Sequence, residues 1–116
     1  MKEHQQMVSN LFKDGEELLS ELTPEKANAW HAATGISGEA GELLDAVKKH
    51  AVYGKEVDRE NVVEELGDLE FYMEAIRSEL GITREETLIH NMRKLGIRYK
   101  DGYSNEAAQE RADKQG

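Results

Sequence analysis

Residues Gly38 to Asp68 read GEAGELLDAVKKHAVYGKEVDRENVVEELGD. This segment contains two acid pairs, Glu39 with Glu42 and Glu65 with Asp68, each at positions i and i+3. Residues at this spacing lie on one face of a helix, so each of two helices would carry two neighbouring carboxylates. Two such pairs facing one another would make a cation site.

The helix that carries the first pair has clear start and stop signals. Thr23 followed by Pro24 is typical of an N-cap with a first-turn proline, and Gly54 can take the left-handed conformation that ends a helix. These signals predict a helix over 24–52. Glycines within 34–38 each cost about 1 kcal/mol relative to alanine in a helix, so a kink or a break is expected there.

The helix that carries the second pair is bounded in the same way. Asp58 is a good N-cap and Gly81 a good terminator, which predicts a helix over 59–80. Thr83 and Glu86 form a capping-box pattern, which predicts a further helix over 83–99.

Outside these three helices the pattern is simpler. Met7, Leu11 and Leu18 recur at helical spacing, which predicts one helix over 3–21. Residues 104–116 have almost nothing to bury and are expected to form a frayed tail or one short helix. We therefore expect four main helices in one domain over residues 1–103, followed by a polar tail over 104–116.

Composition excludes several classes of protein. The chain has 116 residues, enough for one domain, and no cysteine, which excludes disulfides, thiolate metal sites and a cysteine nucleophile. A net charge of -9 argues against binding of a nucleic-acid polymer through a basic surface. No segment has the apolar length of a membrane span or of a signal peptide, so the expected location is the cytoplasm, away from membranes.

The acid pairs are expected at the edge of the hydrophobic core. The apolar stripe of the helix over 24–52 is predicted to consist of Ile36, Ala40, Leu43, Val47 and Ala51. The corresponding stripe of the helix over 59–80 is Val62, Leu66, Leu69, Met73, Ile76 and Leu80. Each acid pair lies on the flank of its stripe, where carboxylates lose hydration and repel one another unless a positive charge compensates.

Carboxylates without histidine or cysteine suit a hard cation, Mg²⁺ or Mn²⁺. A di-iron bundle needs Glu-x-x-His, whereas Thr87 stands three residues before His90. The glycines at 35, 38 and 41 lack the Lys-Ser/Thr signature of a phosphate loop. Acid pairs also arise by chance on the solvated faces of a highly charged chain, so a metal site and a solvated surface both remain open at this point.

Polar and aromatic residues could complete such a site. Asn91, Lys94 and Arg98 share one line of the helix over 83–99 and could bind a polyphosphate, although basic residues in a last turn also favour the helix dipole. Tyr72 lies one turn past Asp68 and could contact a base. His31 lies about two turns before Glu39 and could line the same pocket, but core packing explains both aromatic residues equally well.

With these residues placed, the chain resembles the MazG-like all-α nucleoside triphosphate pyrophosphohydrolases, a superfamily that includes MazG, the dimeric dUTPases and phosphoribosyl-ATP pyrophosphohydrolase. The resemblance covers most of the chain, from Trp30 to Tyr103. It rests on HAATGISGEAGEL over 31–43, VKK over 47–49, EELGD over 64–68, NMRKL over 91–95, RY over 98–99 and DGY over 101–103.

The resemblance implies a four-helix MazG-like bundle that assembles as a homodimer or homotetramer. It also implies Mg²⁺-dependent cleavage of a nucleoside triphosphate to the monophosphate and pyrophosphate, with Mn²⁺ as a possible substitute. The family's metal-binding and catalytic acids match Glu39, Glu42, Glu65 and Asp68. Its phosphate contacts match Lys94 and Arg98, with Asn91 beside them and Lys48 as a further candidate, and its nucleoside contacts match His31 and Tyr72.

A second function class is a non-catalytic acidic helical module, in which the acid pairs are solvated and the helices bury a partner helix. The two classes differ in their response to metal. The enzyme hypothesis predicts a rise in melting temperature with Mg²⁺, and the module predicts none.

Overall fold

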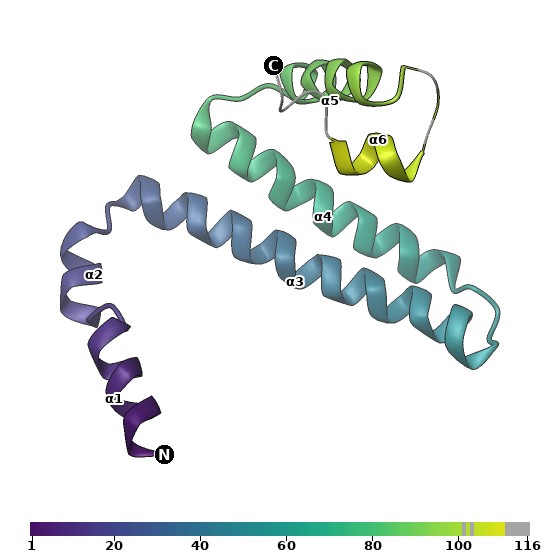
Figure 1. Ribbon diagram of the computed structural model, residues 1–116. Helices are drawn as coiled ribbons and strands as arrows, with labels where there is room; N and C mark the ends of the chain where they lie inside the picture. The colour runs from purple at the N-terminus through teal and green to yellow at the C-terminus, as the bar shows by residue number, and fades with distance from the viewer. Residues whose placement is uncertain (101, 103, 111–116) are drawn as a thin grey trace.

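The computed structural model describes residues 1–100, 102 and 104–110, and all of its regular structure is helical (Figure 1). The described part of the chain contains α1 (Lys2–Leu11), α2 (Gly15–Glu21), α3 (Pro24–Tyr53), α4 (Arg59–Leu80), α5 (Arg84–Arg98) and α6 (Asn105–Glu110). The all-α fold class is confirmed. Asp101, Tyr103 and 111–116, which include part of the expected DGY motif and of the polar tail, lie outside the described residues.

The N-terminal segment forms two helices where the apolar spacing predicted one. The backbone is extended at Phe12, with ψ 126°, and again at Asp14, with ψ 139°, so the hydrogen-bond ladder stops between α1 and α2. Lys13 in this joint forms an ion pair with Glu21 at the other end of α2. The prediction of a continuous helix over 3–21 was wrong because the spacing of Met7, Leu11 and Leu18 carries no information about a break between them.

The predicted ends of α3 are confirmed. Thr23 Oγ1 accepts a hydrogen bond from the Lys26 backbone N–H at 3.2 Å, and Gly54 ends the helix with φ 67°. The glycine-rich segment over 34–38 does not break the helix, which is continuous for 30 residues. Packing against α4 compensates there for the low helix propensity of glycine.

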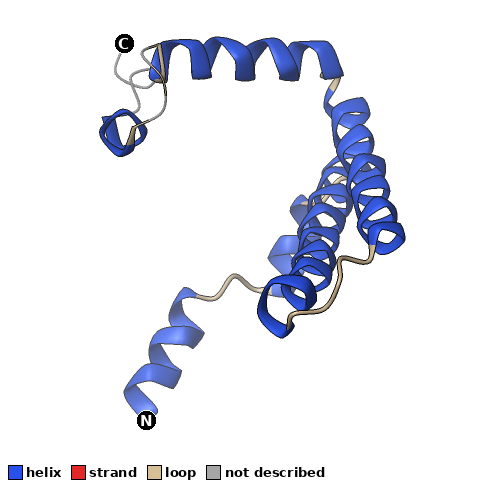
Figure 2. Cartoon of the chain, turned by 90° about the vertical axis from the view of Figure 1, so that its right-hand side faces the viewer, coloured by secondary structure: helices blue, strands red, loops and turns tan. Residues whose placement is uncertain are grey.

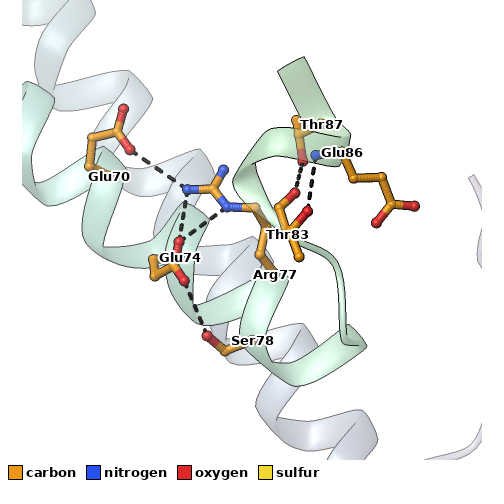
Figure 3. A network of polar contacts seen from close by, with 7 residues as sticks. All are labelled: Glu70, Glu74, Arg77, Ser78, Thr83, Glu86 and Thr87. Atoms are coloured by element: carbon orange, nitrogen blue, oxygen red, sulfur yellow. Dashed lines mark hydrogen bonds and ion pairs between the residues drawn. The ribbon is translucent and has the colours of Figure 1, made fainter. Parts of the chain in front are cut away.

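The joint between α4 and α5 also follows the predicted caps. Gly81 ends α4 with φ 68°, and Thr83 Oγ1 accepts from the Glu86 N–H at 3.0 Å to start α5. Beside this joint the Arg77 side chain is only 7% exposed, and its Nη2 lies 3.1 Å from a Glu74 carboxylate oxygen (Figure 3). The last turn of α4 is therefore held by a partly buried ion pair in addition to its glycine cap.

The central packing unit is the antiparallel pair of α3 and α4, joined by the short connector over 54–58 (Figures 1 and 2). In the described part of the chain, α3 and α4 alone pack along their lengths. α1 and α2 extend away from the start of α3, while α5 leaves the end of α4 and projects away from the helix pair, with α6 beside α5 (Figures 1 and 2). Among the described residues, the buried ones are Ala32, Ala46 and Arg77.

The seam between α3 and α4 differs from the predicted stripes. On α3 it runs through Ala32, Gly35, Ile36, Glu39, Leu43 and Ala46. Ala40, Val47 and Ala51 of the predicted stripe are exposed, as are Leu66 and Leu80 on α4. Small residues in the seam let the two helix backbones approach closely. Compared with the predicted stripe, α3 is rotated about its axis, so that Glu39 lies in the seam itself and not on its flank.

None of the helices in the described segments combines the length and apolar character needed to cross a membrane.

Candidate metal centre

Three of the four predicted acids meet between α3 and α4. Glu39 from α3, and Glu65 and Asp68 from α4, each offer one carboxylate oxygen, and these three atoms lie within 4.8 Å of one another. All three residues are half-buried. The i, i+3 spacing places Glu65 and Asp68 on one face of α4, and the helix pairing then brings Glu39 opposite them.

The charge distribution of this cluster favours a positive partner. The pKa of the Glu65 carboxyl is raised to about 7, first because its protonated form would share a hydrogen bond with Glu39, then by desolvation and by repulsion from Glu39, Asp68 and Glu42. The ionised carboxylates have no proton to donate to one another, and the buried Glu65 Oε2 accordingly has no hydrogen-bond partner. A proton or a cation would remove this repulsion.

Glu42 occupies a different position from the other three acids. It is exposed on α3, one turn past Glu39, and its carboxylate lies outside the group of three that meet. It is nevertheless close enough for its charge to raise the pKa of Glu65. Of the four acids predicted from the sequence, the structure therefore brings three into one cluster and leaves the fourth beside it.

The predicted aromatic contacts, Tyr72 and His31, lie together on the side of the α3–α4 pair that carries the acid cluster. The Tyr72 ring covers the backbone of Gly35 so closely that a Cβ on this glycine would lie 2.3 Å from the ring. The ring centroids of His31 and Tyr72 are 6.1 Å apart, and Phe71 contacts Tyr72 edge-on at 5.1 Å. This close approach explains why a glycine is required in the middle of α3.

These rings form part of a groove of about 270 Å³ between α3 and α4. Sequence reasoning missed three of its polar and aromatic residues, Asn28, Phe71 and Glu79. Helical spacing could have found two of them, because Asn28 is three residues before His31 and Glu79 is seven residues after Tyr72.

The predicted phosphate contacts are not brought to the acids within this chain. Asn91, Lys94 and Arg98 lie on α5, which does not pack along α3 or α4 (Figure 2). Lys94 and Arg98 are half-buried and Asn91 is exposed. Lys48 is exposed near the far end of α3, where its Nζ lies 6.0 Å from the centroid of the Tyr53 ring.

The cluster of Glu39, Glu65 and Asp68 fits a hard divalent cation. Its donors are all carboxylate oxygens, the type that Mg²⁺ and Mn²⁺ prefer, and one buried oxygen lacks any partner. Three carboxylates leave coordination positions for water or for substrate oxygens. The protein is thus an all-α domain in which one helix pair presents a cluster of three carboxylates that could hold a cation.

The comparison with known families identifies which such domain this is. The MazG nucleotide pyrophosphohydrolase domain matches residues 30–103, so the chain belongs to this family. The match spans α5, the acids on α4 and all of α3 from Trp30 onward. No curated protein and no solved structure matches the chain significantly. Members of this family are nucleotide pyrophosphohydrolases that typically depend on a divalent metal, which agrees with the acidic cluster.

Proposed function

We propose that the protein hydrolyses a nucleoside triphosphate to the monophosphate and pyrophosphate, with Mg²⁺ as the cofactor and Mn²⁺ as a possible substitute. The observation that carries this proposal is the meeting of Glu39, Glu65 and Asp68 within a domain of the MazG family. Three carboxylates at such close range repel one another, and a divalent cation turns that repulsion into attraction.

The carboxylates have two tasks in this proposal. Glu39, Glu65 and Asp68 would hold the cation, and Glu42, one turn along α3, would join them as a fourth ligand by a change of side-chain rotamer. The bound cation would polarise a phosphoryl oxygen and lower the pKa of the attacking water. One of the four carboxylates would accept the proton of that water, which is the general-base part of the reaction.

The substrate contacts come from two regions. His31 and Tyr72, which line the groove beside the acids, would contact the nucleoside. Asn91, Lys94, Arg98 and Lys48 would neutralise the phosphates, but α5 does not lie on the acids within one chain. We therefore propose a homodimer or homotetramer in which α5 of another copy approaches Glu39, Glu65 and Asp68.

Exposed apolar residues support this assembly. Leu88, Met92 and Leu95 on α5 are 44%, 71% and 41% exposed, although they form one apolar stripe. If α5 docks on a second copy, this stripe becomes covered, and Lys94 and Arg98 on the same helix are carried to the acids of that copy.

We also propose a cytoplasmic location for the enzyme.

The deciding experiment measures pyrophosphate release by the purified protein with Mg²⁺ or Mn²⁺ on a panel of canonical and modified nucleoside triphosphates. We expect release that requires the metal, together with a rise in melting temperature on metal addition. If no substrate releases pyrophosphate, the proposed enzymatic activity is refuted. Absence of any metal-induced rise as well would favour the non-catalytic helical module, whose supporting observation is the exposed apolar stripe on α5.

A further inference from the structure

The acid cluster lies in the middle of the seam between α3 and α4. The two buried alanines of α3, Ala32 and Ala46, are each seven residues from Glu39, one before it and one after it. Seven residues are about two helical turns, so both alanines lie on the same side of α3 as Glu39. The separation of the two helices at the acids is therefore fixed by the contacts on either side of them.

The contact nearest to the acids on one side joins Tyr72 to Gly35. Gly35 is four residues before Glu39 on α3. Tyr72 is four residues after Asp68 on α4, and the two helices are antiparallel (Figure 1), so this contact lies about one turn from the acids. A Cβ on Gly35 would lie 2.3, 2.4 and 2.5 Å from three atoms of the Tyr72 ring. Only glycine permits so close an approach of the ring to the α3 backbone.

The Tyr72 ring has little freedom to yield to a larger residue at position 35. One of the three overlapping atoms is Cγ, the ring atom nearest to the α4 backbone, so the overlap is not confined to the tip of a flexible side chain. His31 and Phe71 also lie beside this ring. An ordinary Cβ contact begins at 3.4 Å, so Gly35→Ala would displace α3 from α4 by about 1 Å at this point.

A displacement of about 1 Å is comparable to the difference in size between two common cations. Oxygen ligands lie about 2.0–2.1 Å from Mg²⁺ and about 2.3–2.6 Å from Ca²⁺. Two oxygens on opposite sides of the ion are therefore about 4 Å apart around Mg²⁺ and about 5 Å apart around Ca²⁺. Glu39 approaches from α3, and Glu65 and Asp68 approach from α4, so the separation of the helices decides which of these distances the carboxylates span.

We infer that the contact between Tyr72 and Gly35 is a spacer that keeps the acid cluster narrow, so that the cluster favours Mg²⁺ over the larger Ca²⁺. Tyr72 and Gly35 act here as positioning residues, because neither belongs to the group of three acids and both act through the distance between α3 and α4. This inference rests on the proposed function for the presence of a cation, and it adds the contact that selects the cation by size.

The test measures cation binding by the full chain without nucleotide. Binding of Mn²⁺ is followed by the electron paramagnetic resonance signal of the free ion, and competition with Ca²⁺ and with Mg²⁺ gives the ratio of the Ca²⁺ to the Mg²⁺ dissociation constant. In Gly35→Ala this ratio should fall by about fivefold or more, because a wider cluster suits the larger ion. A loss of stability alone would weaken the binding of both ions and leave the ratio unchanged.

Two further variants make the result specific to this contact. Gly38→Ala is the matched control, because this exposed glycine of α3 has open space where its Cβ would lie, and the ratio should keep its wild-type value. Gly35→Ala combined with Tyr72→Ala removes the ring that the new Cβ would overlap, and the ratio should return to within about twofold of the wild type. If Gly35→Ala does not fold, it is measured in the Gly38→Ala background, which has the higher helix propensity of alanine.

The outcomes separate this inference from the proposed function. A ratio that Gly35→Ala leaves unchanged, or that Gly38→Ala lowers equally, would overturn the spacer and leave the enzyme intact. The wild type decides the question if no Gly35→Ala variant folds: tighter binding of Mg²⁺ than of Ca²⁺ supports the spacer, and equal or tighter binding of Ca²⁺ overturns it. A wild type that binds none of the three ions also overturns it, and the proposed function fails with it only if pyrophosphate release is absent as well.

Discussion

The α3–α4 pair and the helices around it use their apolar faces differently. α3 and α4 cover one another along a seam that contains Ala32 and Ala46, both buried. In contrast, Leu11 and Phe12 at the end of α1 are 78% and 79% exposed, and α5 exposes its apolar stripe. Caps and propensity are enough to define a helix, whereas a site needs two helices that hold each other in register. The acids meet where such a pair exists.

The largest effect is expected from removing a carboxylate of the packed pair. Glu65→Gln should lower pyrophosphate release by about a hundredfold or more. Mutation of a residue that only hydrogen-bonds to a metal ligand already lowers metal affinity or activity by about 10–100-fold. Glu65→Gln should also abolish the Mg²⁺-induced rise in melting temperature. Turnover assays and thermal melts measure both effects.

The matched control for Glu65→Gln is Glu64→Gln, the neighbouring acid, which is exposed. Equal losses in the two variants would show that net charge on α4, and not the acid cluster, governs activity.

The close approach of α3 to α4 can be tested at two glycines of the same helix. Gly35→Ala should destabilise the protein by about 1–3 kcal/mol, because its Cβ would overlap the Tyr72 ring. Gly41→Ala meets nothing within 4 Å and should stabilise the helix by up to about 1 kcal/mol. Denaturant unfolding measures both. Destabilisation by Gly41→Ala would mean that this open face of α3 is covered by another copy.

Removal of helix caps should affect global stability differently in the α3–α4 pair and in α5. Asp58→Ala removes the side chain that accepts from the Asn61 N–H at 3.1 Å, and it should lower global stability by about 1 kcal/mol. Thr83→Ala removes the equivalent cap of α5. In the monomer we expect faster hydrogen exchange in α5 with little change in global unfolding, since α5 does not pack along the pair. A global loss equal to that of Asp58→Ala would show that α5 is packed in solution.

The smallest effect is expected from pH. In the metal-free protein the pKa of Glu65 is raised to about 7 from an ordinary value of 4.5. The folded state therefore binds this proton more tightly than the unfolded chain does, and the resulting stabilisation is present below the ordinary pKa and is lost as the pH rises through the folded pKa. Melting temperature without metal should fall from about pH 5 to about pH 8 more in the wild type than in Glu65→Gln.

Mg²⁺ reverses this trend, because the metal and the proton compete for the same carboxylates. The metal-induced rise in melting temperature should therefore be larger at high pH than at low pH. A rise that does not depend on pH would place the metal away from Glu65.

Much of the candidate site could be predicted from spacing. The acid pairs at i and i+3 placed Glu65 and Asp68 together, and the family resemblance named the same residues. Spacing could not predict that Glu39 lies in the seam while Glu42 stays exposed, because this depends on how α3 is rotated against α4. Nor could it predict the pairing of Asn28 with Glu79, which are 51 positions apart in the chain.

Local sequence signals account for the helices and for most of their ends. Thr23, Asp58 and Thr83 start helices, and Gly54 and Gly81 end them, because caps and left-handed glycines act through hydrogen bonds within a few residues. Three features follow from the packing of the helices instead: which residues form the seam, which three acids meet and where α5 lies. These depend on contacts between residues far apart in the chain, where the small side chain of Gly35 and the ring of Tyr72 set the distance and rotation of the two helices.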